Sequence, residues 1–594
     1  LTGALADFSG PSFPAPSDLV SDQSLVRAAW ESVTDLLESS GLGGPNSNNN
    51  ASPQNGSSPL PAAAKNITFS IGLFSLHDPN AFSLQFHHTS PEVSASPTNG
   101  TKRVDDNSIY RIASVTKVFT VLAGLRTLSD TDWERPLGEI LPDLSNNNAT
   151  SNSGVLSTPW DKITPRALAA QIGGVPRDGF PNLGEIAIQA ALANTTEAEL
   201  MASSGLPPMN LTDPLSNPPC IPYLLLNEPC PSTPYLQGVA PRPPTFPPWS
   251  TPAYSNNGFT LLGLALSALT DTTIPSLFAS KIFTPLQMSS SFSDPPPSEF
   301  LPRSVIVSSD PLVAGFTYPN GIFASSGGVF STLSDMARFG IGILNSTLLS
   351  SEATRRWLKP VSYTARMEYD VGAPWEIIRR VDGNSGKVTE LYTKLGDSGA
   401  FSSWFVLVPE YGMGFSVLGA GTAGERFGVV AALADAVADR VVPALPGQAG
   451  VEAEGSFAGV YMAGGELNST MVVGRGRGDG LVVESWVSNG TDVLPFLTER
   501  VTGPGPFRLL PSGVDEENGR VAFRLVGATD APSSSTGAKQ GGLFSAPGMM
   551  SPDWLGVDAS TYYGLGVSLF VFDVEKDGKA TAVTVPAYRV TMTK

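Results

Sequence analysis

One serine–lysine pair in this chain has the spacing that nucleophilic catalysis needs. Lys117 is the only lysine with a serine, Ser114, three positions before it. In a helix, residues i and i+3 lie about one turn apart on one face, so a neutral lysine amine can take the serine proton. The apolar run at 118–128 predicts a buried helix that holds the pair. For this motif alone, a solvated lysine after a helix-capping serine is the alternative interpretation.

A second motif supplies a tyrosine and an asparagine that could complete a proton relay. Tyr254 and Asn256 lie within residues 252–258, which precede the apolar stretch 259–269. This pattern predicts a loop that runs into a buried helix. A tyrosine hydroxyl beside Ser114 could shuttle a proton, and the asparagine amide could orient the lysine and a substrate carbonyl.

A third motif places a lysine on a predicted strand. Residues 391–398 predict a strand and a glycine-rich turn, and residues 404–408 predict the next strand. The ammonium group of Lys394, on the first strand, could line one side of a cleft.

In this order, the motifs S-x-x-K, Y-x-N and K-x-G resemble the serine β-lactamase and penicillin-binding-protein superfamily, especially its class C β-lactamase and esterase-like branch. The resemblance covers residues 60–445. It implies an α/β catalytic domain with a mostly antiparallel sheet flanked by helices. It also implies that a loop containing Gly327 and Gly328 lies beside the site.

The resemblance implies a role for each motif residue. Ser114 attacks a carbonyl, Lys117 and Tyr254 remove and relay its proton, and Lys394 supplies positive charge. The backbone N–H groups of Ser114 and Asp397 form the oxyanion hole, and water hydrolyses the acyl-enzyme. The pKa of Lys117 must then fall well below about 10.4, and burial and the second lysine both lower it. No cofactor or metal is implied.

Two departures from the family pattern bear on the substrate. Leu395 stands where the family usually has a hydroxyl that helps to hold a β-lactam carboxylate, and Asp397 adds a negative charge beside the oxyanion donor. Together with Gly396, Gly327 and Gly328, Leu395 is expected to line the substrate site. We therefore expect hydrolysis of an ester, lactone or amide that is neutral near the scissile bond. A β-lactamase, an acyltransferase and a catalytically silent binding protein are the alternatives.

Other motifs in the chain compete weakly with this assignment. Residues 318–320 form a second Tyr-x-Asn, but its central proline and following glycine are typical of a turn. Ser398 lies in a chymotrypsin-like G-D-S-G, which requires a histidine base. The three histidines, His77, His87 and His88, crowd into one predicted hairpin. A zinc site is not expected there, because one short strand pair rarely completes a tetrahedron.

The amino-acid composition limits the kinds of molecule that the protein is expected to bind. The 594-residue chain carries a formal net charge of −18, which disfavours binding to nucleic acid or to an anionic membrane surface. The most apolar run, 427–442, is interrupted by charged residues and is not expected to span a bilayer. The expected partner is a small-molecule or peptide-like substrate, and the oligomeric state is left open.

Glycosylation motifs and cysteines favour the secretory route. The N-terminus lacks a signal pattern, which fits a cytosolic protein or a mature secreted one. The two cysteines, Cys220 and Cys230, could form one disulfide, with two reduced thiols as the alternative. Ten asparagines begin N-x-S/T: Asn50, Asn55, Asn66, Asn99, Asn148, Asn194, Asn210, Asn345, Asn468 and Asn489. We therefore expect an extracellular protein whose signal peptide has been removed.

The chain divides into three expected parts. Residues 1–65 form an N-terminal segment with an amphipathic stretch and a flexible loop, and 66–446 form the catalytic domain. Within the latter, the proline-rich, cysteine-pinned insertion 204–250 predicts a rim or lid over the cleft, or a passive surface insertion. A proline- and glycine-containing linker is expected before 451–594. Alternating apolar patterns there predict an all-β sandwich or barrel, which resembles the C-terminal β-domain of some secreted fungal β-lactamase-like proteins.

Overall fold

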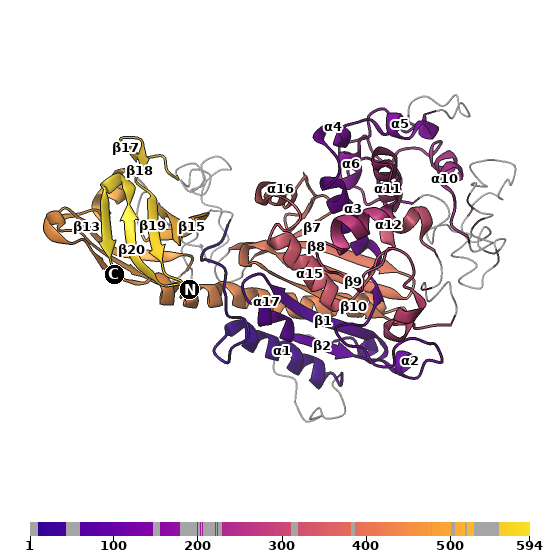
Figure 1. Cartoon of the computed structure of the whole chain (residues 1–594), viewed down its shortest axis with the longest axis horizontal. Helices are drawn as coiled ribbons and strands as arrows, with labels where there is room; N and C mark the ends of the chain where they lie inside the picture. The colour runs from indigo at the N-terminus through magenta and orange to yellow at the C-terminus, as the bar shows by residue number, and fades with distance from the viewer. Residues whose placement is uncertain are drawn as a thin grey trace.

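The structure is a computed structural model of the whole chain (Figure 1). Cys220, Phe316 and a few further single residues are described outside the continuous stretches. Those stretches are 10–42, 60–145, 155–178, 228–309, 319–381, 387–476, 478–500, 505–516, 519–527 and 557–594.

An eight-stranded antiparallel sheet forms the centre of the catalytic domain, in the order β2-β1-β10-β9-β8-β7-β6-β5. Every residue of β1 and β10 is buried, because both faces of the sheet are covered. The strands are β1 (Thr68–Ser75), β2 (Gln85–His88), β5 (Ser362–Tyr363), β6 (Tyr369–Val371), β7 (Glu376–Val381), β8 (Val388–Ser398), β9 (Phe401–Val408) and β10 (Met413–Ala420).

Helices cover one face of this sheet (Figure 1). They include α3 (Thr116–Leu125), α11 (Asn256–Thr270), α12 (Ile274–Phe278) and α15 (Leu333–Leu344). Phe119 of α3 stacks on Phe339 of α15, with ring centroids 3.8 Å apart. The predicted α/β fold with an antiparallel sheet and flanking helices is confirmed.

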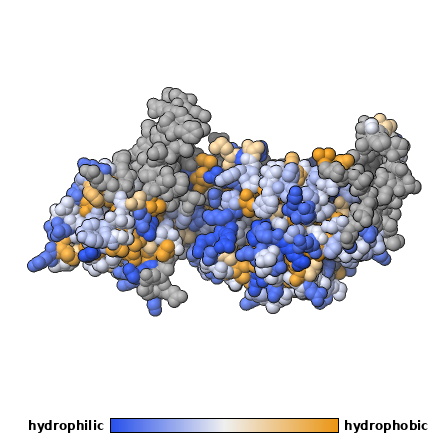
Figure 2. All heavy atoms as spheres, turned by 90° about the horizontal axis from the view of Figure 1, so that it is seen from above, coloured by the Kyte–Doolittle hydropathy of each residue, from blue (hydrophilic) through white to orange (hydrophobic). Residues whose placement is uncertain are grey.

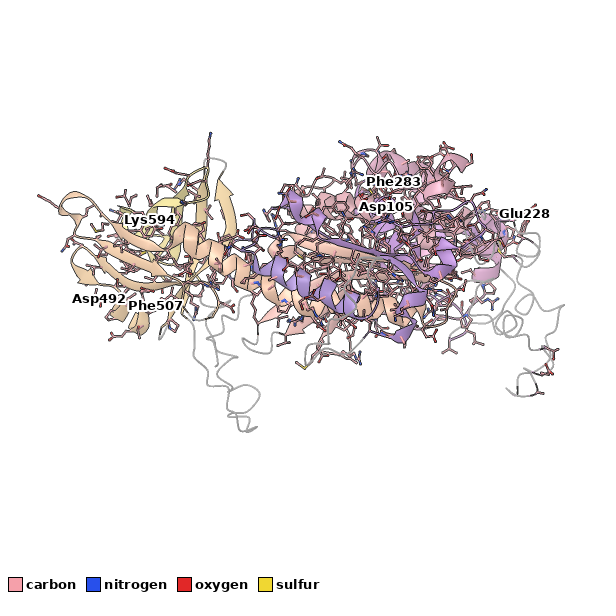
Figure 3. All side chains as sticks on the ribbon, turned by 90° about the horizontal axis from the view of Figure 1, so that it is seen from below. Asp105, Glu228, Phe283, Asp492, Phe507 and Lys594 are labelled. Carbon is pink, nitrogen blue, oxygen red and sulfur yellow. A yellow bond between two sulfur atoms is a disulfide. The ribbon has the colours of Figure 1, made fainter. Side chains whose placement is uncertain are left out.

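Two long helices cover the opposite face (Figure 1). The predicted amphipathic stretch is α1 (Leu25–Ser39), whose N-terminal N–H groups are capped by the Ser24 hydroxyl. It packs along α17 (Arg426–Phe457), which contacts β9 and β10. Figure 3, seen from below, shows α17 running from this sheet into a second body that carries Asp492, Phe507 and Lys594.

The linker expected at 446–450 is wrong, because α17 continues through it with Pro443 and Pro446 inside. Each internal proline costs about 3 kcal/mol in a helix. Burial of a large apolar side chain contributes about 1.5–3 kcal/mol, and five such side chains flank the two prolines between residues 437 and 457. They are Val437, Val441, Val442, Leu445 and Phe457. Their summed burial outweighs the two prolines, so no break forms.

The C-terminal body is an all-β domain, as predicted. Its nine-stranded antiparallel sheet has the order β12-β11-β21-β20-β19-β16-β15-β13-β14, and an additional β12–β13 pairing closes it into a barrel-like shape. The strands are β11 (Gly459–Met462), β12 (Thr470–Gly474), β13 (Leu481–Ser488), β14 (Thr491–Asp492), β15 (Phe507–Glu516), β16 (Arg520–Gly527), β19 (Leu569–Val574), β20 (Ala580–Val585) and β21 (Val590–Thr593). From above, both bodies show polar and apolar residues interspersed (Figure 2).

Part of the 204–250 insertion belongs to the main core, while its role as a rim, a lid or a surface insertion stays a prediction. Helix α10 (Ser232–Val239) buries Tyr235 and Leu236 in the main core. A disulfide joins Cys220 to Cys230, and both cysteines belong to the same core. The apolar spacing of Tyr235, Leu236 and Val239 explains this burial. Most of residues 204–227 lies outside the described residues.

Among the described helices, no single one is long and apolar enough to cross a membrane. Helix α11 and the segment Ile274–Phe283 pass that test of length and composition as a pair, with a bend of 77° between them.

Candidate active site

A strained turn presents the predicted nucleophile. Ser114 lies in a single 3-10 turn, Ala113–Val115, directly before α3. Ala113 has φ +46°, a left-handed conformation that costs a residue with a side chain roughly 1–2 kcal/mol. The turn is fixed from both sides, since Ile112 N–H donates to Val329 O and Val329 N–H donates to the Thr116 hydroxyl, each at 3.0 Å.

The predicted base, Lys117, is completely buried beside this turn. Its Nζ lies 2.9 Å from Ser114 Oγ, 2.8 Å from Asn256 Oδ1 and 2.6 Å from Ser326 O. The amide oxygen and the backbone carbonyl can only accept hydrogen bonds. A neutral amine therefore donates its two N–H groups to them, and its lone pair faces the Ser114 hydroxyl. This is the geometry that a general base requires.

The orientation of the Asn256 amide follows from a residue that the sequence did not single out. Asn256 Nδ2 donates to Asp178 Oδ1 at 2.8 Å, so its oxygen must face Lys117. The Asp178 carboxylate also pairs with Arg177, with Nε 3.2 Å from Oδ2. These two residues directly follow the glycine-rich break at 173–176, which is the one sequence signal that could have indicated them.

Burial lowers the pKa of Lys117 because the interior disfavours the charged ammonium. The Lys394 cation lowers it further, while negative charge on Tyr254 or Glu376 acts in the opposite direction. The net direction is downward, which increases the share of the neutral amine at a given pH.

Tyr254 lies on the other side of the nucleophile, with its hydroxyl 2.7 Å from Ser114 Oγ. Burial alone would raise the pKa of Tyr254, but the ammonium groups of Lys117 and Lys394 lower it below its ordinary value. These nitrogens lie 5.1 Å and 5.2 Å from the centre of the tyrosine ring. Tyr254 and Lys117 thus form one coupled pair in which either group can take the Ser114 proton.

The loop that carries Tyr254 is held by Gln171, which the sequence analysis also missed. Ser255 N–H donates to Gln171 Oε1 and Ala253 N–H donates to Gln171 O, both at 2.8 Å. The Ser255 hydroxyl then caps α11 by accepting from Gly258 N–H at 2.7 Å. Tyr254 is therefore fixed by neighbours on both sides in the chain.

The predicted cation, Lys394, does not stand alone. Its side chain is 1 % exposed, and Nζ donates to the carboxylate of Glu376. The second carboxylate oxygen accepts from Leu395 N–H at 2.8 Å. Glu376 reaches both donors because it opens β7, opposite Thr393 of β8. No motif marks this glutamate in the sequence.

The strand edge that carries Gly396 lies directly against the nucleophile turn. A Cβ on Gly396 would lie 2.3 Å from Ile112 O and 3.1 Å from Ser114 N, so a glycine is needed where β8 meets the nucleophile turn. In a strand, N–H groups two residues apart point in the same direction. The Asp397 N–H therefore leaves the same edge as that of Leu395, beyond the last residue that pairs with β7.

The side chain of Asp397 does not act as expected. Side chains alternate along a strand, so Asp397 and Leu395 leave the face opposite to Lys394 and Gly396. Asp397 Oδ1 accepts from the Ser402 hydroxyl at 2.6 Å and from Arg426 Nη2 at 3.0 Å. Its charge is therefore balanced by Arg426, and the expected repulsion of an anionic substrate by Asp397 is wrong.

Three of the expected substrate-binding residues take part through their backbones. The carbonyl of Leu395 accepts from Lys394 Nζ at 2.8 Å. The nearest atom to a Cβ on Gly327 would be Ala113 C, at 3.8 Å, so this glycine supports the nucleophile turn. Gly328 O accepts from the Asn320 side chain at 2.9 Å. The structure thus places Gly327 beside the nucleophile turn and Gly328 beside Asn320, and their expected lining role stays a prediction.

Within the described residues, the competing motifs make structural contacts. Asn320 is buried, accepts from Arg111 and donates to two backbone carbonyls, while Tyr318 lies outside the described residues. His87 contacts Ser70 and Gln85, and His88 contacts two backbone carbonyls. Ser398, the serine of the G-D-S-G motif, takes no part in these hydrogen bonds. Over the part of the chain that the structure describes, no three His, Cys, Asp or Glu side chains group as metal ligands.

Comparison with known proteins bears directly on this arrangement. A family model described as "Beta-lactamase" matches residues 93–440, which is more than half of the chain. The chain belongs to the beta-lactamase family. A second model, described as "Beta-lactamase-like-like, C-terminal domain", matches residues 449–594. All the residues of the site described above fall within the first match.

Two similar fungal proteins extend over both domains. The chain is 27% identical over 563 residues to a "Beta-lactamase-like protein" of Arthroderma benhamiae, covering 88% of this chain and 87% of that protein. It is 24% identical over 540 residues to the "Probable hydrolase clz13" of Cochliobolus lunatus, covering 86% and 82%. A solved structure of a D-stereospecific amidohydrolase from Streptomyces sp. aligns with a TM-score of 0.43 and 17% identity, over 61% of this chain and 92% of that one.

The contact between Gly396 and the nucleophile turn gives a test of this geometry. Gly396→Ala should lower kcat/KM by at least about a hundredfold, because the new methyl group must displace Ile112 or Ser114. Gly424→Ala is the matched control, since a Cβ there meets nothing within 4 Å. Circular dichroism and thermal unfolding would show that both variants fold. Normal activity of Gly396→Ala would contradict the placement of β8 against Ser114.

Proposed function

We propose that this member of the beta-lactamase family is a serine hydrolase that forms an acyl-enzyme on Ser114 with an ester, lactone or amide. The observation that carries the proposal is the set of contacts around Lys117 Nζ. Two fixed acceptors take its N–H groups and leave its lone pair for the Ser114 hydroxyl. The name of the Cochliobolus relative, a probable hydrolase, agrees with this class of reaction.

In the proposed first step, Ser114 Oγ attacks the substrate carbonyl carbon as its proton passes to the Lys117–Tyr254 pair. The N–H groups of Ser114 and Asp397 stabilise the negative charge on the carbonyl oxygen. Tyr254 delivers the proton to the leaving alcohol or amine, and the bond to the leaving group breaks. Water then attacks the acyl-enzyme, and the same pair accepts its proton as the acid is released and Ser114 is restored.

We also propose that the acyl-enzyme forms from substrates without a carboxylate next to the scissile bond. The Leu395 side chain leaves the face opposite to Lys394, so its missing hydroxyl does not carry this proposal. The proposal is supported by Lys394 Nζ and Leu395 N–H, which already donate to the carboxylate of Glu376. A hydrogen bond to a charged group contributes about 1.5–3 kcal/mol, so the loss of one such contact would weaken carboxylate binding roughly ten- to a hundredfold.

Finally, we propose that the protein is secreted and glycosylated. The five described sequon asparagines, Asn66, Asn99, Asn345, Asn468 and Asn489, are all exposed. The other five, Asn50, Asn55, Asn148, Asn194 and Asn210, lie outside the described residues. The Cys220–Cys230 disulfide is typical of an oxidising compartment.

The proposed nucleophile can be tested by covalent labelling. Ser114→Ala should lose all labelling by a fluorophosphonate, measured by intact mass, whereas Ser398→Ala should be labelled like the wild type. Labelling that persists in Ser114→Ala and maps to Ser398 would refute the assignment. Failure of the folded wild type to form an adduct with any ester, lactone or β-lactam would favour the silent binding protein. Products formed with added alcohols or amines would identify an acyltransferase.

The proposed base can be tested by a change that keeps its charge. Lys117→Arg should lower turnover at least about a thousandfold, because a guanidinium stays protonated and cannot accept the Ser114 proton. Lys359→Arg, at an exposed position, should be silent. Near-normal turnover of a folded Lys117→Arg enzyme would rule out Lys117 as the base.

Secretion and glycosylation can be tested on protein from the native host. The protein should be found in the culture medium, and its intact mass should fall on treatment with a peptide N-glycosidase, which hydrolyses the glycosylated side-chain amide and converts Asn to Asp at occupied sequons. Protein confined to the cells, with all five exposed asparagines unmodified on peptide mapping, would refute this proposal.

A further inference from the structure

We infer that Glu376 is a built-in counter-ion that occupies the anion-binding position of the site and selects against substrates with a carboxylate near the scissile bond. This inference deepens the proposed function and rests on it. It assigns specificity to a residue outside the three sequence motifs.

The first argument is the geometry around the carboxylate of Glu376. One oxygen accepts from the ammonium of Lys394, and the other accepts from Leu395 N–H at 2.8 Å. An ammonium and a backbone N–H are also the donors that would hold a carboxylate supplied by a substrate. Because Glu376 already pairs with both donors, a substrate carboxylate must displace it from Leu395 N–H and must share or displace its contact with Lys394.

The second argument is that Glu376 is fixed in place. It is paired with Thr393 across the β7–β8 ladder, and the Thr393 hydroxyl donates to Glu376 O at 2.6 Å. The preceding residue, Trp375, is completely buried. The Glu376 side chain is only 13 % exposed and Lys394 is 1 % exposed. Separating this pair would leave Lys394 buried without a counter-ion, which is unfavourable.

The third argument is the charge balance around Ser114. With Lys117 neutral as the base, the remaining cations are Lys394 and Arg177, and each pairs with a carboxylate. Lys394, the buried cation of this pair, therefore offers an anionic substrate less charge than an unpaired lysine would, whereas Arg177 is largely exposed. The carboxylate of such a substrate would also meet the fixed charges of Glu376 and Asp178.

The decisive experiment uses two esters that differ in charge and little in size. In the purified full-length protein, 4-nitrophenyl butyrate should be a better substrate than 4-nitrophenyl hemisuccinate. Glu376→Gln keeps an acceptor for Leu395 N–H but removes the charge, so Lys394 becomes available. The ratio of kcat/KM for hemisuccinate to that for butyrate should rise at least about tenfold.

Glu390→Gln is the matched control. Glu390 lies on β8 opposite Arg379 of β7, with the charged atoms 3.9 Å apart. Its replacement therefore removes a carboxylate from the same pair of strands without changing the contacts of Lys394. It should leave the ratio of the two kcat/KM values unchanged. An unchanged ratio in Glu376→Gln, or a wild type that prefers the hemisuccinate, would overturn the inference even if fluorophosphonate labelling of Ser114 is normal.

A measurement on the wild type covers the case in which Glu376→Gln does not fold. Phenylboronic acid and 3-carboxyphenylboronic acid both add reversibly to a nucleophilic serine, and only the second carries a carboxylate. The neutral compound should inhibit ester hydrolysis at least as strongly. Tenfold tighter inhibition by the carboxylated compound would overturn the inference, whereas absence of any covalent adduct with Ser114 would overturn the proposed function itself.

Discussion

A buried amine without contact to water must find all of its hydrogen-bond partners in the protein. Lys117 is completely buried, so the catalytic domain must supply these partners. Its three partners come from three separate segments: the nucleophile turn, the start of α11 and the short helix before Val329. A buried charge costs several kcal/mol unless it is paired, so the neutral form is favoured. The convergence of these segments is therefore both a packing requirement and the origin of the base.

Local patterns were sufficient to predict the residues whose geometry is local. The helical spacing of Ser114 and Lys117 brings their side chains together in any helix that begins here. The Thr164 and Thr332 hydroxyls cap the N-termini of α6 (Pro165–Ala169) and α15, and these contacts are likewise local. The alternating pattern of apolar residues along β19 likewise indicated a strand of the C-terminal sheet.

The residues that sequence reasoning missed all act through tertiary contacts. Glu376 reaches Lys394 only because β7 pairs with β8 in one register, and Asp178 reaches Asn256 across 78 positions of the chain. Asp397 shows the converse. Strand alternation was sufficient to predict its face, but its partner Arg426 lies 29 residues away in α17. Because the Arg426 partner of Asp397 was not known from the sequence, the expectation that Asp397 repels an anionic substrate was wrong.

The continuity of α17 also constrains how the two domains could diverge. Helical residues advance by about 1.5 Å and turn by about 100° each, so an inserted residue would rotate everything beyond it by that angle. The buried side chains of α17 contribute to the core under the first sheet at one end and to the β-domain core at the other. Length changes near Pro446 would thus move the apolar stripe out of phase with one core. Insertions in this helix are tolerable only in steps that restore its phase, a restriction that a flexible linker would not impose.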